Sequence, residues 1–311
     1  MGLPKLFPRS TYHYRPSQRL RRLATVLMVV GLANANAAAQ EVPGTFVSIQ
    51  VPGARLTSPR AIAADGRIVG FFVDASGQHG FLLADGQFTR IDAPVSGARS
   101  TMAFGINNRG DVVGAWVDSE GVQHGFLWPA HGTFTSIDVP DAMRTLARGI
   151  NSAGDVVGVY DNPDKRRAFL LSRKGVLTRI DLPGTFGPPV NGTWATSINS
   201  RGDIVGPGFD GSIHGYLISG DTVTQLDVPF AGAMNTQAYG LNARGDIVGY
   251  YMVGSKSLGF RRDRHGNYES IEAPSAVNTT AWGINETGDI VGQYLFGGVT
   301  RGFVLYRSPN P

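Results

Sequence analysis

Short apolar segments alternate with polar turns along almost the whole chain. In one regular stretch the apolar runs cover residues 102–106, 111–116, 124–128 and 134–140, and they are rich in β-branched and aromatic residues. Gly, Asn, Asp and Pro occupy the segments between these runs, which is typical of strands joined by tight turns. Since no segment outside the N-terminal leader has an apolar period near 3.6 residues, the pattern predicts an all-β fold.

One five-residue motif, Gly-Asp-Ile/Val-Val-Gly or a close variant, recurs along the chain. Its copies begin at Gly66, Gly110, Gly154, Gly202, Gly245 and Gly288, at intervals of 44, 44, 48, 43 and 43 residues. Four predicted strands in each interval of this length are the signature of a β-propeller blade. We name the strands of a unit a to d in chain order. The repeat predicts units near residues 58–94, 101–140, 145–183, 193–229, 236–274 and 279–306.

The two ends of the chain predict how the ring closes. The last unit stops at its third strand, near residues 303–306, whereas residues 45–52 match the fourth strand of the second unit at 133–140. The N-terminal strand is therefore expected to complete the last blade, which would leave no long unpaired edge. We predict a six-bladed β-propeller with four-stranded blades, forming a single domain over residues 40–311.

The first 39 residues are predicted to be a cleaved signal peptide. Arginines between residues 15 and 22 precede an apolar run at 23–32, and Ala37 to Ala39 fit a small-residue cleavage site. The alternative is a membrane anchor, but the run has only about half of the ~20 residues that a spanning helix needs. We therefore expect a secreted or periplasmic protein without stable membrane insertion after cleavage.

Charge and composition exclude some functions. The chain carries 28 basic and 24 acidic residues, but residues 1–40 hold six of the basic ones and no acid, so the remainder has a net charge of −2. Such a body has no electrostatic drive toward nucleic acid. The absence of cysteine excludes disulfides and thiolate metal sites. We expect a monomer with no cofactor and no bound metal.

The repeated elements resemble a known class of bacterial extracellular protein. Units of the form G-I-N-x-x-G-D-[IV]-V-G, followed by H-[GA]-F-L and I-D-x-P, are similar to the HAF repeats, and the similarity spans nearly all of residues 45–306. The H-A-F element is represented by His79-Gly80-Phe81 and His124-Gly125-Phe126, and it degrades to Leu258-Gly259-Phe260 near the C-terminus. The resemblance implies a propeller-like repeat protein and brings no defined activity.

Several repeated polar residues are interpreted as structural. Arg-Gly-Asp occurs three times, at 109–111, 201–203 and 244–246, where Gly-Asp closes the a–b turn. One acid near the end of strand d recurs, and we expect it to bond to neighbouring backbone; these acids are Asp92, Asp138, Asp181, Asp227 and Glu272. Histidines share one position in three units and are too dispersed to share a zinc ion; they are His79, His124 and His214.

Candidate ligand-binding residues are those that break the repeat. Strand a of a propeller lines the central channel, and its aromatic or basic residues differ from unit to unit. Two further candidates are Phe186, in the long loop at 184–191 before the fourth unit, and Trp194, in that unit. The full set is Arg60, Phe104, Arg148, Phe186, Trp194, Tyr239 and Trp282. Because the d–a connections vary in length whereas the a–b turns are uniform, we expect the ligand on the d–a/b–c face. No catalytic residue is assigned.

These observations favour a binding or interaction module whose partner is a carbohydrate or a cell-surface protein. Aromatic faces with polar edges suit sugar rings. One alternative is a polysaccharide-active enzyme, a glycoside hydrolase or lyase, at the channel mouth; its acids would include Asp118, Glu120, Asp161 and Asp164. The other alternative is a structural envelope protein without ligand or turnover.

Overall fold

The structure is a computed structural model that describes residues 44–182, 192–209 and 211–307. This part of the chain contains strands and no helix, so the all-β prediction is confirmed. The predicted signal peptide and Phe186 lie outside the described residues. A further prediction, that the fourth unit carries a long loop at 184–191, also falls outside them.

Four of the sheets each contain the four strands of one unit, in chain order and antiparallel. The first of these sheets holds β6 (Ser100–Ile106), β7 (Val112–Val117), β8 (Gln123–Trp128) and β9 (Thr135–Ile137). The second holds β10 (Arg144–Ile150), β11 (Val156–Asp161), β12 (Arg166–Leu171) and β13 (Leu177–Ile180). The third holds β14 (Ser197–Ile198), β15 (Ile204–Phe209), β16 (Ile213–Ser219) and β17 (Thr222–Leu226). The fourth holds β18 (Ala233–Leu241), β19 (Ile247–Val253), β20 (Lys256–Arg262) and β21 (Tyr268–Ile271).

The remaining strands form one eight-stranded sheet, which corrects the prediction of six separate four-stranded blades. It contains β2 (Leu56–Ile62), β3 (Ile68–Val73), β4 (Gln78–Ala84) and β5 (Gln87–Ile91) from the first unit. It also contains β22 (Asn278–Ile284), β23 (Ile290–Phe296) and β24 (Val299–Tyr306) from the last, with β1 (Thr45–Ile49). The two units are joined where β24 and β2 run parallel, through the single partner pair of Leu56 and Thr300.

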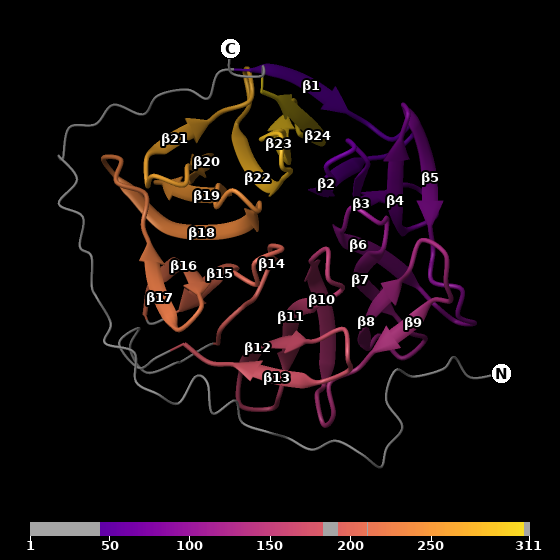
Figure 1. Ribbon diagram of the computed structural model, residues 1–311. Helices are drawn as coiled ribbons and strands as arrows, with labels where there is room; N and C mark the ends of the chain where they lie inside the picture. Colours follow the sequence, from indigo (N-terminus) through magenta and orange to yellow (C-terminus); the bar gives the residue numbers. More distant parts are fainter. Residues whose placement is uncertain (1–43, 183–191, 210, 308–311) are drawn as a thin grey trace.

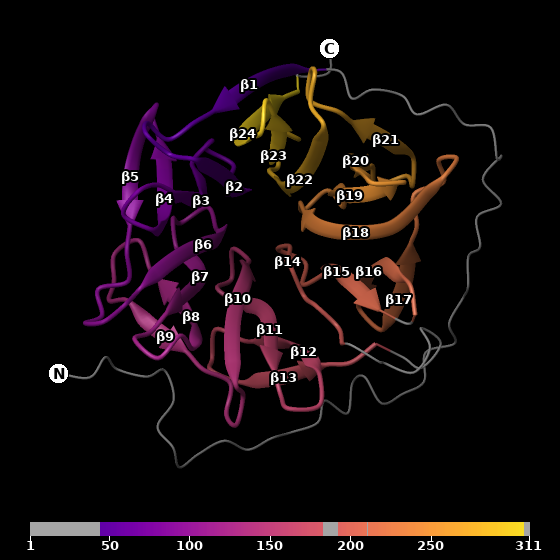
Figure 2. The same cartoon turned by 180° about the vertical axis from the view of Figure 1, so that it is seen from behind.

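The N-terminal strand completes the last unit, as the sequence predicts. β1 pairs with β24 in antiparallel register from Thr45 opposite Tyr306 to Ile49 opposite Gly302. Both ribbon views show the sheets arranged around a central axis, with strands a toward the centre and strands d toward the rim (Figures 1 and 2). This arrangement is a β-propeller, and the pairing of β1 with β24 joins its two chain ends.

The two most repeated sequence elements pack on each other inside each unit. In the second unit, a Cβ added to Gly114 would overlap the carbonyl oxygen of Met102 and lie 2.6 Å from Cε1 of Phe126. Phe126 itself is fully buried. The second glycine of the Gly-Asp-Ile/Val-Val-Gly motif is therefore the residue that lets the H-A-F aromatic ring lie flat against strand b.

The Arg-Gly-Asp triplets have the structural role that the sequence indicates, with one addition. The Arg109 Nε donates to Asp111 Oδ2 at 2.9 Å, and its Nη1 donates to the carbonyl oxygen of Ser152 in the next unit. Gly110 supplies the positive φ of 91° that the turn requires. The arginine thus links neighbouring units across the ring.

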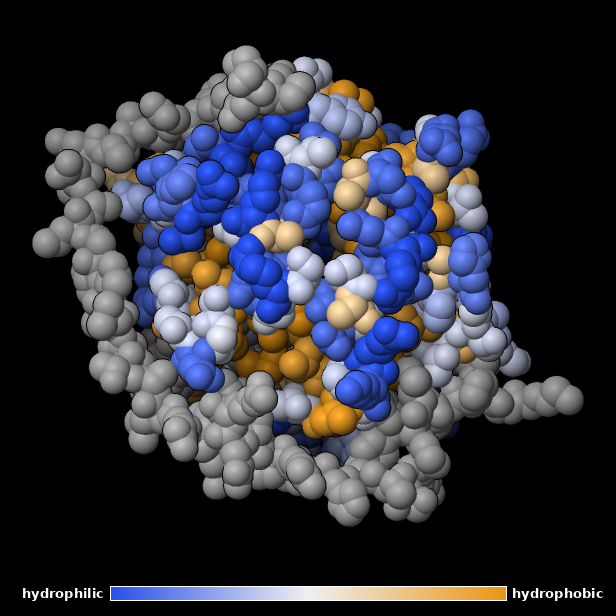
Figure 3. All heavy atoms as spheres, viewed as in Figure 1, coloured by the Kyte–Doolittle hydropathy of each residue, from blue (hydrophilic) through white to orange (hydrophobic). Residues whose placement is uncertain are grey.

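On the face shown in Figure 3, hydrophilic residues cover much of the surface and hydrophobic residues show in the lower central part. Cores of buried apolar residues fill the spaces between successive sheets; one of them combines Ala63 and Ile91 of the first unit with Phe126 of the second. Packing between units, added to the hydrogen bonds within them, holds the ring together.

Candidate functional site

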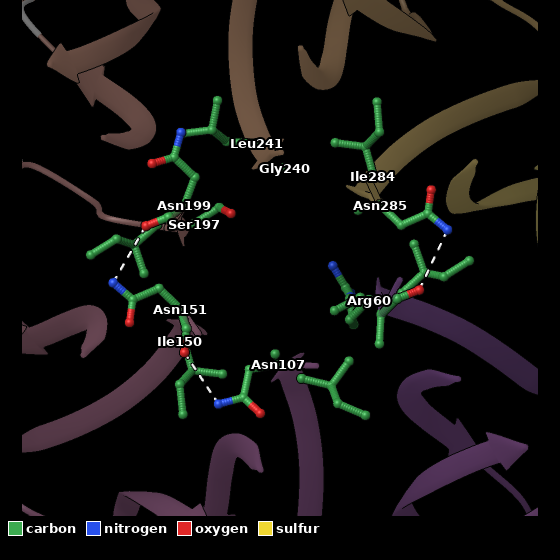
Figure 4. Close-up of a pocket in the computed structure, with 18 of the residues that line it drawn as sticks. Arg60, Asn107, Ile150, Asn151, Ser197, Asn199, Gly240, Leu241, Ile284 and Asn285 are labelled. Atoms are coloured by element: carbon green, nitrogen blue, oxygen red, sulfur yellow. Dashed lines mark hydrogen bonds between the residues drawn. The ribbon is translucent and has the colours of Figure 1, made fainter. Parts of the chain in front are cut away.

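A cavity of about 410 Å³ occupies the centre of the ring, where the first strands of the units meet. Its wall is built from β2, β6, β10, β14, β18 and β22 together with the turns that follow them (Figure 4). A volume of this size lies in the range of small-molecule sites. Of the predicted site residues the cavity brings together Arg60, Phe104, Arg148, Tyr239 and Trp282.

These five residues occupy the same structural position, a β-bulge in strand a. In β6 the register moves from Ala103 to Gly105, so that Phe104 has no partner on β7. The equivalent register shifts skip Arg60, Arg148, Tyr239 and Trp282. A bulge re-aims the extra side chain relative to the regular pleat. The fourth unit has Thr196 at this place, and its hydroxyl donates to the carbonyl oxygens of Val205 and Ala238 instead.

The two arginines of the cavity wall lie against aromatic rings. The guanidinium carbon of Arg60 is 3.9 Å from the Trp282 ring centroid and 4.9 Å from that of Phe71. That of Arg148 is 4.7 Å from the Phe104 ring centroid. Such cation–π contacts stabilise each cation by about 0.5–2 kcal/mol. Figure 4 shows Arg60 reaching from β2 into the space enclosed by the strands.

The same residues carry hydrogen-bond donors without acceptors. The Nε of Arg60, the Nε of Arg148 and the Nε1 of Trp282 are buried and have no partner within the described residues. Burial, and then the positive charge of Arg148, lower the pKa of Arg60 to about 9, so it stays protonated at neutral pH. Burial also lowers the pKa of Arg148. The cavity wall therefore offers two charged donors and one neutral donor that a bound ligand can satisfy.

The cavity opens on the face of the a–b turns, and the placement of the ligand on the d–a/b–c face stays a prediction. Its wall extends to exposed residues of those turns, among them Asn108, Ser152 and Ser200. Met102 and Leu146, nearer the other ends of the same strands, belong to a buried apolar cluster.

A ring of asparagines surrounds the cavity at the level of the a–b turns. Each side-chain Nδ2 donates to the main-chain oxygen of the equivalent residue in the next unit, for example Asn107 to Asn151 at 3.1 Å and Asn242 to Asn285 at 3.0 Å. Asn285 continues the ring to Ala63 of the first unit at 3.4 Å. Ala63 has no side-chain amide, so it cannot donate the equivalent hydrogen bond to the second unit. Sequence reasoning did not assign these residues to the site, although the recurrence of Asn before each Gly-Asp turn was the available signal.

Trp194 lies outside the central cavity wall, in a second hollow of about 930 Å³ beside the third and fourth units. There the guanidinium carbon of Arg166 is 4.6 Å from its ring centroid. The Nε of Arg166 donates to Asp161 Oδ1 at 2.7 Å, and Arg144 donates to the other carboxylate oxygen. The predicted set of site residues is thus divided between two hollows.

The repeated acids and the repeated basic residues are each other's partners, which corrects the expectation that the acids bond to backbone. The Nδ1 of His79 lies 2.8 Å from Asp92 Oδ1, and the Nδ1 of His124 lies 2.7 Å from Asp138 Oδ1. In the fifth unit the Nζ of Lys256 donates to Glu272. Each pair joins strands c and d of one unit, so these residues stabilise the units individually.

Two of the four acids of the alternative enzyme hypothesis, Asp118 and Asp161, have lowered pKa values. Burial opposes ionisation of Asp161, but hydrogen bonds from Arg166 and Arg144 outweigh it and lower its pKa. Backbone N–H donors and His124 lower the pKa of Asp118. A general acid for glycoside hydrolysis needs a raised pKa. Neither residue meets that requirement.

Residues 44–182, 192–209 and 211–307 hold no group of three His, Cys, Asp or Glu side chains that could bind a metal ion. The same described residues include no helix long and apolar enough to cross a membrane.

Comparison with known proteins adds the fold and little more. No family model matches the chain, and no curated protein is similar to it. AofleA from Arthrobotrys oligospora is similar in structure with a TM-score of 0.55 and 15% identity, over 85% of this chain and 87% of that one. A mutant of Aleuria aurantia lectin AAL in complex with Fucalpha1-6GlcNAc has a TM-score of 0.51 and 12% identity, over 86% and 99%. TolB from Acinetobacter baumannii has a TM-score of 0.53 and 14% identity, over 78% and 64%.

At these identities the similarity defines the class of protein as a β-propeller and leaves the ligand to be argued from the site. The neighbours differ in kind, since one is a lectin with a bound disaccharide and another is TolB. The propeller frame therefore carries different functions in proteins of similar shape, and function must be sought in the residues of the cavity.

Proposed function

We propose that this protein is a binding module that holds a carbohydrate in its central cavity. The observation that carries the proposal is the wall formed by Trp282 and Tyr239, whose ring centroids lie 4.5 Å apart at an interplanar angle of 86°. The Trp282 Nε1 is a buried donor without an acceptor. Aromatic faces contact the apolar faces of a sugar ring, and free N–H groups donate hydrogen bonds to its hydroxyl oxygens.

The asparagine ring gives the cavity mouth a polar rim that suits a hydroxylated ligand. Exposed Asn108, Ser152 and Ser200 surround the entrance, and the bulge residues, which are half-buried or buried, lie farther in. A polar rim around an aromatic wall is the usual composition of a small-ligand site. The lectin among the structural neighbours, in complex with Fucalpha1-6GlcNAc, agrees with a carbohydrate ligand for this class of fold.

A saccharide panel tests the proposal on the purified protein. Tryptophan fluorescence and calorimetry would be measured with neutral and acidic mono- and oligosaccharides, for the unchanged protein and for Trp282→Leu. Trp128→Phe is the matched control, because Trp128 packs edge-on against Phe134 away from the cavity. We expect Trp282→Leu to weaken binding at least tenfold and the control to leave it unchanged. If the protein binds none of the saccharides in the panel, the proposal is wrong.

We further infer that the eight-stranded sheet acts as two blades, which gives a ring of six. β24 and β2 share one partner pair, whereas β2 and β3 pair from Leu56 to Ile62. An experimental structure with hydrogen bonds along the whole of β24 and β2 would contradict this inference.

We also propose that the protein belongs to the HAF-repeat class and that it is secreted or periplasmic. The support is the repeated sequence elements and the arginine-rich, apolar leader with its small-residue cleavage site. Fractionation of cells that express the full chain, with N-terminal sequencing of the product, tests the localisation. A product that retains residues 1–39 in the cytoplasm would contradict it.

A further inference from the structure

The central cavity contains an excess of positive charge that no described side chain neutralises. Arg60 and Arg148 both belong to its wall, and its one carboxylate is that of Glu286 in the a–b turn of the last unit. Glu286 accepts the backbone N–H of Ala243 through both of its oxygens, at 3.0 and 3.1 Å. The two arginines therefore face the cavity without an acidic partner.

Several other arginines of the described residues are paired with acids, unlike Arg60 and Arg148. Arg109 lies 2.6 Å from Asp111 and Arg201 lies 2.7 Å from Asp203. Arg166 lies 2.7 Å from Asp161. Among the described residues no carboxylate lies within ion-pair distance of Arg60 or Arg148. An acid lies beside each of these three arginines, and no described acid lies within ion-pair distance of the two bulge arginines.

Every unsatisfied group of the bulge residues is a donor. The Nε atoms of Arg60 and Arg148 and the Nε1 of Trp282 are buried without an acceptor. A guanidinium and an indole have no acceptor atom to offer. A ligand that satisfies all three must present acceptor oxygens, and an ionised carboxylate presents acceptors only.

Electrostatic repulsion between the two arginines also favours an anionic ligand. Two cations removed from water repel each other, and the repulsion from Arg148 contributes to the lowered pKa of Arg60. Contacts with aromatic faces compensate only part of that cost. An anion in the cavity would offset this repulsion.

We propose that the ligand of the central cavity is an acidic saccharide, whose carboxylate binds to Arg60 and Arg148 while its ring lies against Trp282. This inference rests on the proposed carbohydrate-binding function and adds to it the class of sugar. It assigns the roles within the wall: the arginines select the charge, and the aromatic residues hold the ring.

The test compares sugars that differ only in the charged group. Methyl galacturonoside and methyl galactoside share one ring, and methyl glucuronoside and methyl glucoside form a second matched pair. Calorimetry would measure the affinity for all four sugars, with the unchanged protein and with the double variant Arg60→Gln and Arg148→Gln. The control variant is Arg99→Gln with Arg173→Gln, because both of these arginines are exposed and the change in net charge is the same.

We expect at least one uronoside to bind ten- to a hundredfold more tightly than its neutral partner, the range given by charge-assisted hydrogen bonds. The double variant at 60 and 148 should lose that preference, whereas the control should keep it. Circular dichroism and a melting curve establish that each variant folds, and Arg60→Lys with Arg148→Lys, which keeps both charges, should retain part of the preference.

Two results separate the failure of this inference from that of the proposed function. If neutral and acidic sugars bind equally and binding depends on Trp282, the carbohydrate function stands and the anion selection is wrong. If no sugar changes the signal in any variant, both are wrong. Selection of a sulfated sugar with no uronoside binding would also overturn the assignment of a carboxylate.

Discussion

The guanidinium carbon of Arg60 lies 3.9 Å from the centroid of the Trp282 ring. This cation–π contact is one of the contacts that join the first and last units of the chain. These residues are separated by nearly the whole sequence, and each is the bulged residue of its strand a. The contact holds the cation against an aromatic face, as the contact with the Phe104 ring does for Arg148. It therefore connects closure of the ring with the chemistry of the cavity.

Replacing both unpaired cations should stabilise the empty protein. Arg60→Met with Arg148→Met keeps the apolar stems against the aromatic rings and removes two desolvated charges. We expect the melting temperature to rise by roughly 2–4 °C, which corresponds to about 1 kcal/mol in a protein of this size. Differential scanning calorimetry without ligand checks this, and a lowered melting temperature would show that the charges are already compensated.

Gly114→Ala should be among the most destabilising single-methyl changes in this chain. The new Cβ would overlap the Met102 carbonyl oxygen and lie 2.6 Å from Phe126, and main chain cannot move aside as a flexible side chain can. We expect a loss of roughly 3 kcal/mol or more in the free energy of unfolding. Gly175→Ala is the control, because its φ is +79° but nothing lies within 4 Å. Gly114 has no positive φ, so equal losses at both positions would show that the overlap costs no more than the strain of a left-handed backbone, and they would contradict the prediction.

The asparagine ring predicts that substitutions at two equivalent positions, 199 and 63, change the stability of the protein in opposite directions. Asn199→Ala removes hydrogen bonds to Asp203 at 2.9 Å and to the Asn242 carbonyl oxygen at 3.2 Å. It should lower the free energy of unfolding by about 1–3 kcal/mol because buried partners lose their bonds. Ala63→Asn with Arg67→Asp rebuilds the turn sequence of the other units and supplies the missing donor. It should raise stability by about 0.5–1.5 kcal/mol.

Chemical denaturation of the two variants checks this prediction. Ala63→Asn alone serves as the control, because Asp111 bonds to the equivalent asparagine and Arg67 cannot do so. If the double variant is no more stable than the unchanged protein, the ring of amide bonds is not a source of stability at that junction.

The sequence predicts the frame of this molecule well because the frame is periodic. The repeated Gly-Asp turns locate the first hairpin of each unit, and the match of residues 45–52 to 133–140 predicts the pairing of β1 with β24. The joining of two units into one sheet could not be predicted. It depends on the partner pair of Leu56 and Thr300, which is set by how closely β24 and β2 approach in space.

Choosing residues that break the repeat found five residues of the cavity wall, but not the side on which the cavity opens. Arg60 and Trp282 differ from their equivalents in type, which the sequence shows directly. The side on which the cavity opens depends on side-chain packing, in which Met102 and Leu146 join one buried apolar cluster. That packing is a tertiary property. The β-bulge is also invisible in the sequence, since no particular residue type occurs at the skipped position.

The pair of His124 with two carboxylates predicts a pH dependence of stability. A hydrogen bond to Asp138, followed by its charge and by Asp118, raises the pKa of His124 above 6.5 despite the opposing effect of burial. Because the folded-state pKa is raised, the stabilisation is fully present below the unfolded value of 6.5 and is lost as the pH rises through the folded value. The indole of Trp116 stacks on the imidazole at 4.6 Å and fixes its orientation.

His124→Gln should therefore lower the melting temperature more at about pH 5.5 than at about pH 8.5. Titration of the His124 ring protons by NMR should give a pKa above 6.5, and Asp138→Asn should lower it, because the largest favourable interaction is removed. His131→Gln, at an exposed position in the turn between β8 and β9, is the control and should show the same effect at both pH values. A His124→Gln effect that grows with rising pH would mean that the neutral imidazole, acting as a hydrogen-bonded donor, is the stabilising form.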